Sequence, residues 1–268
     1  MRPLVKYILA VILVSVLSAP SSGYIMKKQA IRKAPAGGFA VFRLKNIAGS
    51  VNIQSCDSDT LSVTARFRIR APSKSKAEEI FSETGFDFVE YPGKLYLEPD
   101  LPSLRQYGLF AIEGRARTSV AIDYEVTLPA GMDIEVEITG GDIILEKVKS
   151  SYKLSTERGE IDVERPGRVA GSVKTARGDI TLRAWQCGWD GRFSAECGSG
   201  TINAFFLQSA DLVFEASTLK GDISFLFEGI RPVIRDDNSI MAVFGKGRGR
   251  ISLWSVRGEI NAEEINTD

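Results

Sequence analysis

A three-residue motif recurs through the second half of the chain and constrains the fold more than any other feature. The motif is a glycine, then an acidic residue in all copies but one, then an isoleucine. The six copies begin at Gly141, Gly159, Gly178, Gly200, Gly221 and Gly258. Successive glycines are 18, 19, 22, 21 and 37 residues apart, the last spacing being about two periods. Such a period indicates a repeat architecture in which each unit buries its apolar face against its neighbours.

Aligning the copies on the glycine shows how each period folds. Apolar residues stand two and four positions after the glycine and, in most copies, five and seven positions before it. Apolar residues at alternate positions indicate strands with one buried face. The glycine then lies at the corner between two strands, in a backbone conformation that a Cβ would disfavour. The sequence predicts an all-β fold: a β-solenoid, a parallel β-helix-like stack of coils of about 20 residues.

Two further columns accompany the glycines. Three residues before each glycine, most copies have a small side chain: Thr156, Thr175, Cys197, Thr218 and Ser255. We therefore expect Cys197 to be a small packed residue. A cation also precedes several of these glycines and an acid follows, as in Arg177-Gly178-Asp179. Because this pattern recurs at the equivalent corners of other coils, it predicts an exposed ladder of ion pairs of modest energy.

Residues 24–130 read as a β-rich cap region that carries one helix. A helix is expected from about Ser73 to Thr84, with Ser75 and Glu78 at capping-box spacing and Gly85 at its end. It could cover the open end of the stack. The expected strands are two about Gly49 within 39–53, then 61–69, 86–91, 94–98 and 120–128. Residues 131–268 form the solenoid, which we expect to be one continuous domain with 39–130.

The first 23 residues have the pattern of a signal peptide. Arg2 and Lys6 precede an apolar run from Tyr7 to Ala19. That run is shorter than the roughly 20 residues that span a bilayer as a helix. Cleavage is expected before Tyr24, or earlier in the segment. The sequence thus predicts export to the periplasm or cell surface, with membrane attachment only if the segment stays uncleaved.

Composition narrows the chemistry. The chain of 268 residues has no histidine, which excludes imidazole general bases, Ser-His-Asp triads and imidazole metal ligands. Its 34 Lys and Arg balance 34 Asp and Glu, so no basic excess points to nucleic acid. We expect no cofactor and no metal. Cys56, Cys187 and Cys197 leave at least one thiol unpaired, and whether Cys187 pairs with Cys197 stays open.

Three segments carry candidate ligand contacts. The segment from Leu101 to Ser119 fits no period and is either a binding loop or a mobile insertion. Its candidate contact residues are Arg105, Tyr107, Arg115 and Arg117. Asp190, Arg192 and Glu196 are the candidate catalytic residues of a carbohydrate-active site. They lie close to Trp185 and Trp189, which could stack on sugar rings, although Trp185 could equally cover the core edge. The run from Gly245 to Arg250 resembles a basic, phosphate-binding turn without the ending of a P-loop.

The recurring corners, the Thr/Ser column and the Leu-Pro-Ala-Gly turn at Leu128–Gly131 resemble one bacterial family: β-strand-repeat domains of unknown function that carry the label of adhesins. The resemblance covers roughly Phe39 to Glu264. It implies an envelope-associated β-solenoid with no established catalytic residues. The favoured function is a non-catalytic binding, adhesin-like or scaffold module whose partner is an envelope protein or a glycan. The alternatives are a carbohydrate-active β-helix enzyme and an envelope-stress regulatory partner of a membrane protein.

Overall fold

The computed structural model describes residues 8–19, 23–101, 118–167, 170–184 and 189–265. The first half contains β1 (Ile8–Ala19), β2 (Gly23–Pro35), β3 (Val41–Ala48), β4 (Val51–Cys56), β5 (Thr60–Ala71), α1 (Lys74–Glu83), β6 (Gly85–Tyr91), β7 (Lys94–Asp100) and β8 (Ser119–Pro129). The strands of the repeat begin with β9 (Asp133–Gly140), β10 (Ile143–Glu146), β11 (Tyr152–Arg158), β12 (Ile161–Glu164), β13 (Ala170–Arg177), β14 (Ile180–Ala184), β15 (Arg192–Cys197) and β16 (Ile202–Phe206). The chain continues with β17 (Leu212–Thr218), β18 (Ile223–Leu226), β19 (Ile234–Arg235), β20 (Ser239–Val243), β21 (Gly249–Ser255) and β22 (Ile260–Glu264).

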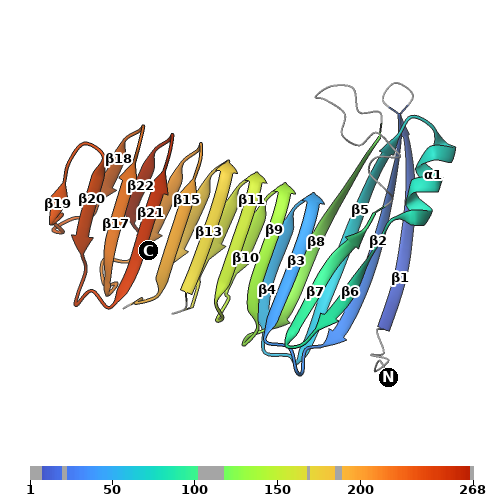
Figure 1. Ribbon diagram of the computed structural model, residues 1–268, viewed down its shortest axis with the longest axis horizontal. Coiled ribbons are helices and arrows are strands. Elements are labelled where there is room, and N and C mark those ends of the chain that lie inside the picture. Colours follow the sequence, from blue (N-terminus) through green and yellow to red (C-terminus); the bar gives the residue numbers. More distant parts are fainter. Residues whose placement is uncertain (1–7, 20–22, 102–117, 168–169, 185–188, 266–268) are drawn as a thin grey trace.

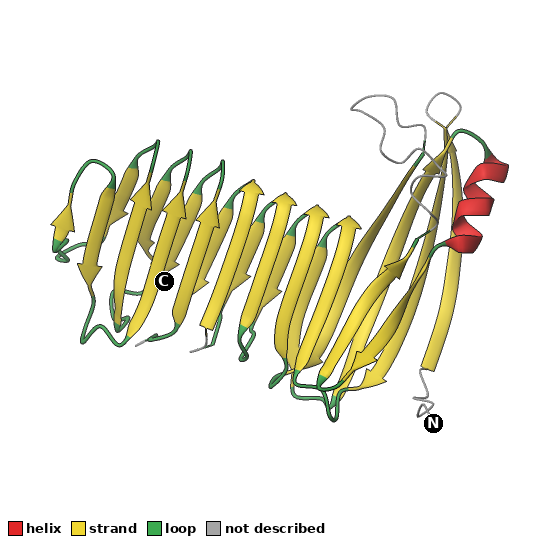
Figure 2. Cartoon of the chain, viewed as in Figure 1, coloured by secondary structure: helices red, strands yellow, loops and turns green. Residues whose placement is uncertain are grey.

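The strands form two sheets of 11 strands each (Figure 1). Sheet A has the order β1-β2-β5-β8-β4-β10-β12-β14-β16-β22-β18. Sheet B has the order β19-β20-β17-β21-β15-β13-β11-β9-β3-β7-β6. Figure 2 shows the strands of both sheets lying side by side along the long axis of the molecule, with α1 at the end opposite β19. Among the described residues, no helix is long and apolar enough to cross a membrane.

Each coil contributes one strand to sheet B, turns at its glycine, and contributes the next strand to sheet A. Coils pair in parallel so that equivalent residues coincide: Ile143 is opposite Ile161, which is opposite Ile180. All three side chains are fully buried. Each coil thus buries its isoleucine against the equivalent isoleucine of the next coil, which confirms the expected β-solenoid.

The order of the coils in space differs from their order in the sequence. The coil formed by β21 and β22 lies between the coil of β15 and β16 and the coil of β17 and β18. Accordingly Ile202 is opposite Ile260, which in turn is opposite Ile223. A stack in chain order therefore does not describe the last two coils. All coils present the same columns, so the repeat pattern does not specify which coil lies next to which.

The C-terminal end of the core is closed by β20, which pairs antiparallel with β17. Residues 227–248 form this closure and lie within the 37-residue spacing between Gly221 and Gly258. An aromatic cluster fills the end of the core: Phe206, Phe214, Phe225, Phe227 and Phe244. Ring centroids in this cluster lie 4.6–6.2 Å apart, a range typical of favourable aromatic packing.

The cap region forms the opposite end. Strands β3 and β4 make the first coil, with Gly49 at its corner, and pair in parallel with β9 and β10. The described residues 57–101 and 118–132 lie outside these two coils, and the chain then returns beside its starting point at β9. Between those two coils it builds β5 and β8, which extend sheet A, and β6 and β7, which extend sheet B. The strands expected in this region are all present.

Helix α1 begins and ends differently from the expectation. Its N-cap is Ser73, whose side chain accepts a hydrogen bond from the backbone N–H of Lys76, so Ser75 and Glu78 do not form the capping box. At the other end Thr84 is the C-cap and Gly85 is already the first residue of β6. The helix buries Ala77 and Ile80 in a small cluster with Met26 and Ile69. It thus packs against β2 and β5.

The N-terminal apolar run lies as β1, antiparallel to β2 at the edge of sheet A. Its sequence, ILAVILVSVLSA, is apolar at nearly every position. Strands with one face in water alternate apolar and polar residues. The next strand, β2, does carry charges at intervals: Lys27, Lys28, Arg32 and Lys33. Charged side chains of this kind are characteristic of strands at an exposed sheet edge.

Candidate functional site

The corner glycines are explained by packing. Gly159 has φ +144°, and a Cβ built on it would lie 1.9 Å from the carbonyl oxygen of Gly141. Each corner glycine from Gly141 onward meets the carbonyl of the preceding glycine in space, in the order 49, 141, 159, 178, 200, 258 and 221. The glycines therefore serve the close approach of successive coils as well as the corner conformation.

The Thr/Ser column serves the same corners. The hydroxyl of Thr156 donates to the carbonyl of Gly141 at 3.3 Å, and that of Thr175 donates to Gly159 at 3.1 Å. The Cys197 thiol donates to Gly178 at 3.4 Å, and the cysteine is free and buried. Burial, together with the nearby Asp179 carboxylate, raises the pKa of this thiol. The expectation that Cys197 is a packed structural residue is confirmed.

Two of the corner acids, Asp142 and Asp179, cap backbone groups of the next coil. The Asp142 carboxylate accepts from the backbone N–H of Glu160 at 2.9 Å, and Asp179 accepts from that of Thr201 at 2.7 Å. Within the part of the chain that the structure describes, no ion pair joins these acids to the corner cations. The expected ladder of corner ion pairs is therefore wrong, because the carboxylates are directed to backbone donors along the stack.

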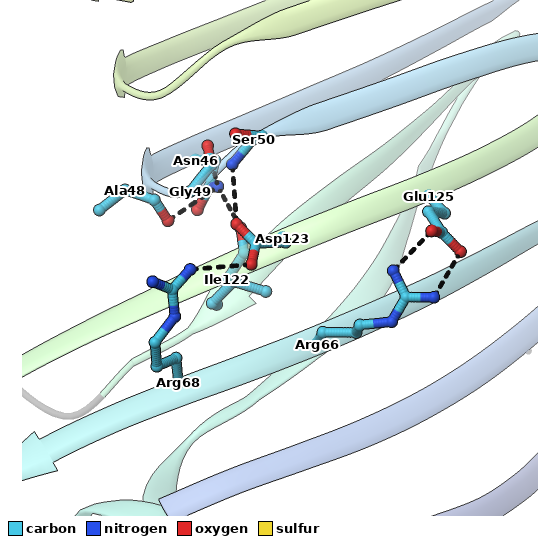
Figure 3. Close-up of polar contacts among 9 residues, drawn as sticks. All are labelled: Asn46, Ala48, Gly49, Ser50, Arg66, Arg68, Ile122, Asp123 and Glu125. Carbon is cyan, nitrogen blue, oxygen red and sulfur yellow. Dashed lines mark hydrogen bonds and ion pairs between the residues drawn. The ribbon is translucent and has the colours of Figure 1, made fainter. Parts of the chain in front are cut away.

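The same arrangement begins in the cap region, where β8 takes the place of a coil (Figure 3). Asp123 accepts from the backbone N–H of Ser50 at 3.0 Å and from Arg68 at 3.1 Å. Buried Asn46 occupies the hydroxyl column and donates to the carbonyl of Ile122 at 2.8 Å. Arg66 forms a bidentate pair with Glu125 (Figure 3). The contacts of Asp123 with Ser50 and of Asn46 with Ile122 hold the first coil on β8, and the two ion pairs join β5 to β8.

The basic turn from Gly245 to Arg250 binds a carboxylate of its own chain. Backbone N–H groups of Lys246 and Arg248 donate to Asp211 at 2.8 and 3.2 Å, and the Arg248 side chain adds a contact of 2.6 Å. Gly245 and Gly247, with φ of +59° and +68°, let the turn close around this group. The phosphate-binding hypothesis is therefore wrong for this structure, since an internal anion fills the turn.

We expect Asp211→Asn to destabilise the protein at neutral pH. Desolvation pushes the pKa of the Asp211 carboxyl upward, but the hydrogen bonds from Arg248 and Lys246 outweigh it and hold the pKa below the ordinary value. A carboxylate with a lowered folded-state pKa stabilises above its unfolded pKa and loses that contribution as the pH falls through the folded pKa. The stability difference between wild type and variant, measured by urea unfolding, should be largest near pH 7 and shrink below about pH 4. A difference independent of pH would contradict this assignment.

The sequence-predicted ligand contacts divide into two groups. Trp185, Arg105, Tyr107, Arg115 and Arg117 lie outside the described residues. Trp189 is described, and its expected exposure is wrong: it is 1% exposed and donates its indole N–H to the carbonyl of Gly167 at 3.2 Å. The ring fills the space above Gly191, which has no side chain. Trp189 is therefore a core residue.

Two of the residues suggested for catalysis, Arg192 and Glu196, lie on β15. Glu196 forms an ion pair with Lys174 at 2.7 Å, and Arg192 is the first residue of β15. Among the described residues, no group of three or more His, Cys, Asp or Glu side chains could hold a metal ion. The remaining thiol in the described part, Cys56, is half-buried and free.

A groove of about 430 Å³ crosses the outer face of sheet B. It passes over five neighbouring strands, β9, β11, β13, β15 and β21. Gly171 lies in its floor on the buried face of β13, where a Cβ would lie 2.1 Å from the ring of Tyr152, so the glycine leaves room for that ring. The small side chains in its lining are Ser151, Ala170, Ser172, Ser194 and Ser252. Its charged side chains are Asp133, Glu135, Lys153, Arg192 and Arg250.

Most of these charges already have protein partners. Glu135 lies 3.7 Å from both Arg43 and Lys94, and Arg250 lies 3.1 Å from Glu215. Asp133 accepts from the backbone N–H of Ser151 at 3.1 Å. The lining thus has two acids and three bases, a net charge of +1.

Next to the groove, the outer face of sheet B becomes apolar. Of the nine exposed large hydrophobic residues in the described part of the chain, seven lie within 219–256, and one of these seven, Leu226, belongs to β18 in sheet A. Strand registers place Ile234 across from Met241 and Val243 across from Val213, and Trp254 follows Ser252 on the same side of β21. We define the apolar face as Val213, Leu219, Ile234, Met241, Val243, Trp254 and Val256.

Trp254 is the functional candidate that the sequence reasoning missed. It is 41% exposed, and on β21 it alternates with buried Leu253 and Ser255. The signal was available in the alignment on Gly258, where Leu253 falls in a buried column and its neighbour must point outward. The sequence pattern instead favours Trp185 and Trp189, because they stand close to Asp190.

The fold and this face define a two-sheet β-solenoid with an exposed groove and apolar surface. The chain belongs to the Toastrack DUF4097 family, whose model matches residues 119–263. This confirms the resemblance to an adhesin-labelled repeat family of unknown function. A comparison with curated proteins finds no match.

Several solved structures are similar at low identity. A "putative cell adhesion protein" from Clostridium sporogenes is 14% identical, with 89% of this chain and 100% of that chain covered and a TM-score of 0.48. A "putative adhesin" from Bacteroides fragilis is 12% identical, with 88% and 97% covered and a TM-score of 0.39. A "putative lipid binding protein" from Parabacteroides distasonis is 9% identical, with 89% and 97% covered and a TM-score of 0.29.

Proposed function

We propose that this protein is an exported, non-catalytic binding module of the bacterial envelope that engages its partner on the outer face of sheet B. The observation that carries the proposal is the concentration of exposed apolar side chains over β17, β19, β20 and β21. Apolar patches of this kind on otherwise polar surfaces mark interaction sites. The rest of that face is charged and internally paired, as between Lys174 and Glu196.

Export is supported by the contrast between β1 and β2. The apolar sequence of β1 suits a cleaved signal peptide better than a sheet edge, whereas β2 carries the charges expected of an edge strand. After cleavage before Tyr24, β2 would become the edge of sheet A. N-terminal sequencing of the exported protein should therefore begin at or near Tyr24, and an intact Met1 would refute cleavage.

The proposed face is tested by crosslinking in the native host. A photo-crosslinking residue placed at Leu219 or Val243 should give a specific adduct after export. The same residue at Thr181, on the outer face of sheet A, is the matched control and should give none. Absence of adducts from both apolar-face positions, or equal adducts from Thr181, would count against the proposal.

The alternative hypothesis, a carbohydrate-active enzyme, has less support than the binding module has from the apolar face. Glu196, the acid suggested for it on β15, is exposed and paired with Lys174. The hypothesis of a regulatory partner of a membrane protein remains compatible with the proposed face. An adduct that contains an integral membrane protein would favour it.

A further inference from the structure

We propose that the groove on sheet B is a binding site for a linear glycan, with Trp254 as a stacking surface at its margin. This inference rests on the proposed function, because it names the class of ligand for the same outer face. It is carried by three features of the groove: the hydroxyl groups in its lining, the complete pairing of its strands, and the exposed tryptophan beside it.

The hydroxyl groups form a row. Register places Ser172 across from Ser194, and Ser194 across from Ser252, on three adjacent strands. Neighbouring strands are about 4.8 Å apart, so the row repeats at that interval along the axis of the solenoid. The Ser194 hydroxyl donates to the carbonyl of Gly171 at 3.5 Å and the Ser252 hydroxyl to Glu215 at 3.4 Å, so both can still accept a hydrogen bond from a ligand. A repeating row of such groups suits a polymer that presents hydroxyl groups at regular intervals.

The pairing of the strands argues against a peptide in the same place. A peptide added to a sheet needs a free edge, where it can bond to unpaired N–H and C=O groups. Every strand beneath the groove has partners on both sides: β11 pairs with β9 and β13, and β15 pairs with β13 and β21. A ligand lying across these strands must therefore be held by side chains, and the lining offers four serine hydroxyls beside its five charged side chains.

The charge of the lining argues against a polyanion. Two acids and three bases line the groove, and Glu135 and Arg250 each already form ion pairs within sheet B. A site for nucleic acid or polyphosphate would show an excess of unpaired cations. The lining instead fits a ligand that is neutral or weakly charged.

Trp254 completes the site. It stands two residues after Ser252 on the same side of β21, about 7 Å further along the strand. Strand register places Glu196 and Ser217 on its two sides. Its ring can contact the apolar face of a pyranose while the serine row contacts the hydroxyl groups, which is the amphipathic role that an indole side chain fills at wet interfaces.

The test uses the exported chain with immobilised peptidoglycan sacculi, chitin oligosaccharides of increasing length and an array of linear polysaccharides. Trp254→Ala should weaken binding to the preferred probe by about tenfold or more, equivalent to about 1.4 kcal/mol, and Trp254→Phe should recover part of it. A double variant, Ser172→Ile with Ser194→Ile, should abolish binding by filling the groove. Thr181→Ile, an outward substitution of the same kind on sheet A, should bind as wild type.

Unfolding midpoints of all variants should match that of the wild type, so that loss of binding reports on the groove. No binding of the wild type to any probe, or undiminished binding by the Trp254→Ala and groove-filling variants, would overturn the glycan inference. If crosslinks from Leu219 persist and lead to a protein in that case, the proposed function survives and its partner is a protein. If those crosslinks are absent as well, both fail.

Discussion

Replacing Gly159 by alanine is expected to lower the free energy of unfolding by about 4 kcal/mol, combining backbone strain and overpacking. Gly159 has φ +144°, which L side chains rarely adopt. The added methyl would also lie 1.9 Å from the carbonyl oxygen of Gly141, which belongs to the backbone of the neighbouring coil. Because backbone on both sides is fixed by parallel pairing, neither coil can move away without breaking hydrogen bonds.

The matched control is Gly131→Ala. Gly131 has no positive φ, and an added Cβ would meet nothing within 4 Å. This substitution should leave stability unchanged or raise it slightly by restricting the unfolded chain. Urea unfolding of the two variants measures the contrast. A loss below about 1 kcal/mol for Gly159→Ala would mean that the corners relax easily and that the glycine column is not required by packing.

A disulfide between positions 194 and 252 is expected to form, whereas one between 194 and 215 is not. In the structure Ser194 is directly opposite Ser252, and Ser252 is directly opposite Glu215. Adjacent strands bring Cα atoms to about 5 Å, within the range of a disulfide, while the next strand but one lies near 10 Å and beyond it. Ser194→Cys with Ser252→Cys should therefore crosslink, as judged by intact mass under non-reducing conditions.

The control pair is Ser194→Cys with Glu215→Cys. The natural cysteines should first be replaced by serine. Serine fits at position 197, because Ser255 is the buried residue at the equivalent position of the neighbouring coil. In a solenoid whose coils followed chain order, β17 would lie next to β15 and the control pair would crosslink instead. That reversed result would contradict the insertion of the last coil between its two predecessors.

The elements of this protein could be read from its sequence with few errors, because each coil carries the same local signals. The isoleucine two residues after each glycine and the alternating columns before it specify strands, their buried faces and the corner between them. The same local logic located β5 through Leu61, Val63 and Phe67, all of which are buried. It missed the helix cap by two residues, since Ser73 and Ser75 are equally good candidates until the backbone is known.

The site was harder to predict because its residues are distant in sequence. Asp133, Ser172, Ser194 and Ser252 line one groove only because four coils bring them to one face. The basic turn at Gly245–Arg250 resembled a phosphate site, and the anion that fills it, Asp211, stands more than 30 residues earlier. Trp189 and Trp254 are both near charged residues in the sequence, and only packing distinguishes the buried ring from the exposed one.

The sequence by itself determined the period, the strands, the corners and the family of this protein, since these depend on interactions between residues at most one coil apart. The tertiary structure alone decided the order of the coils and the composition of the binding face. Every coil presents the same glycine, isoleucine and hydroxyl columns, so stacking in chain order and insertion of β21 and β22 before β17 satisfy the repeat equally well. The physical difference lies in residues 227–248, which do not repeat and which close the core with β20 and Phe244.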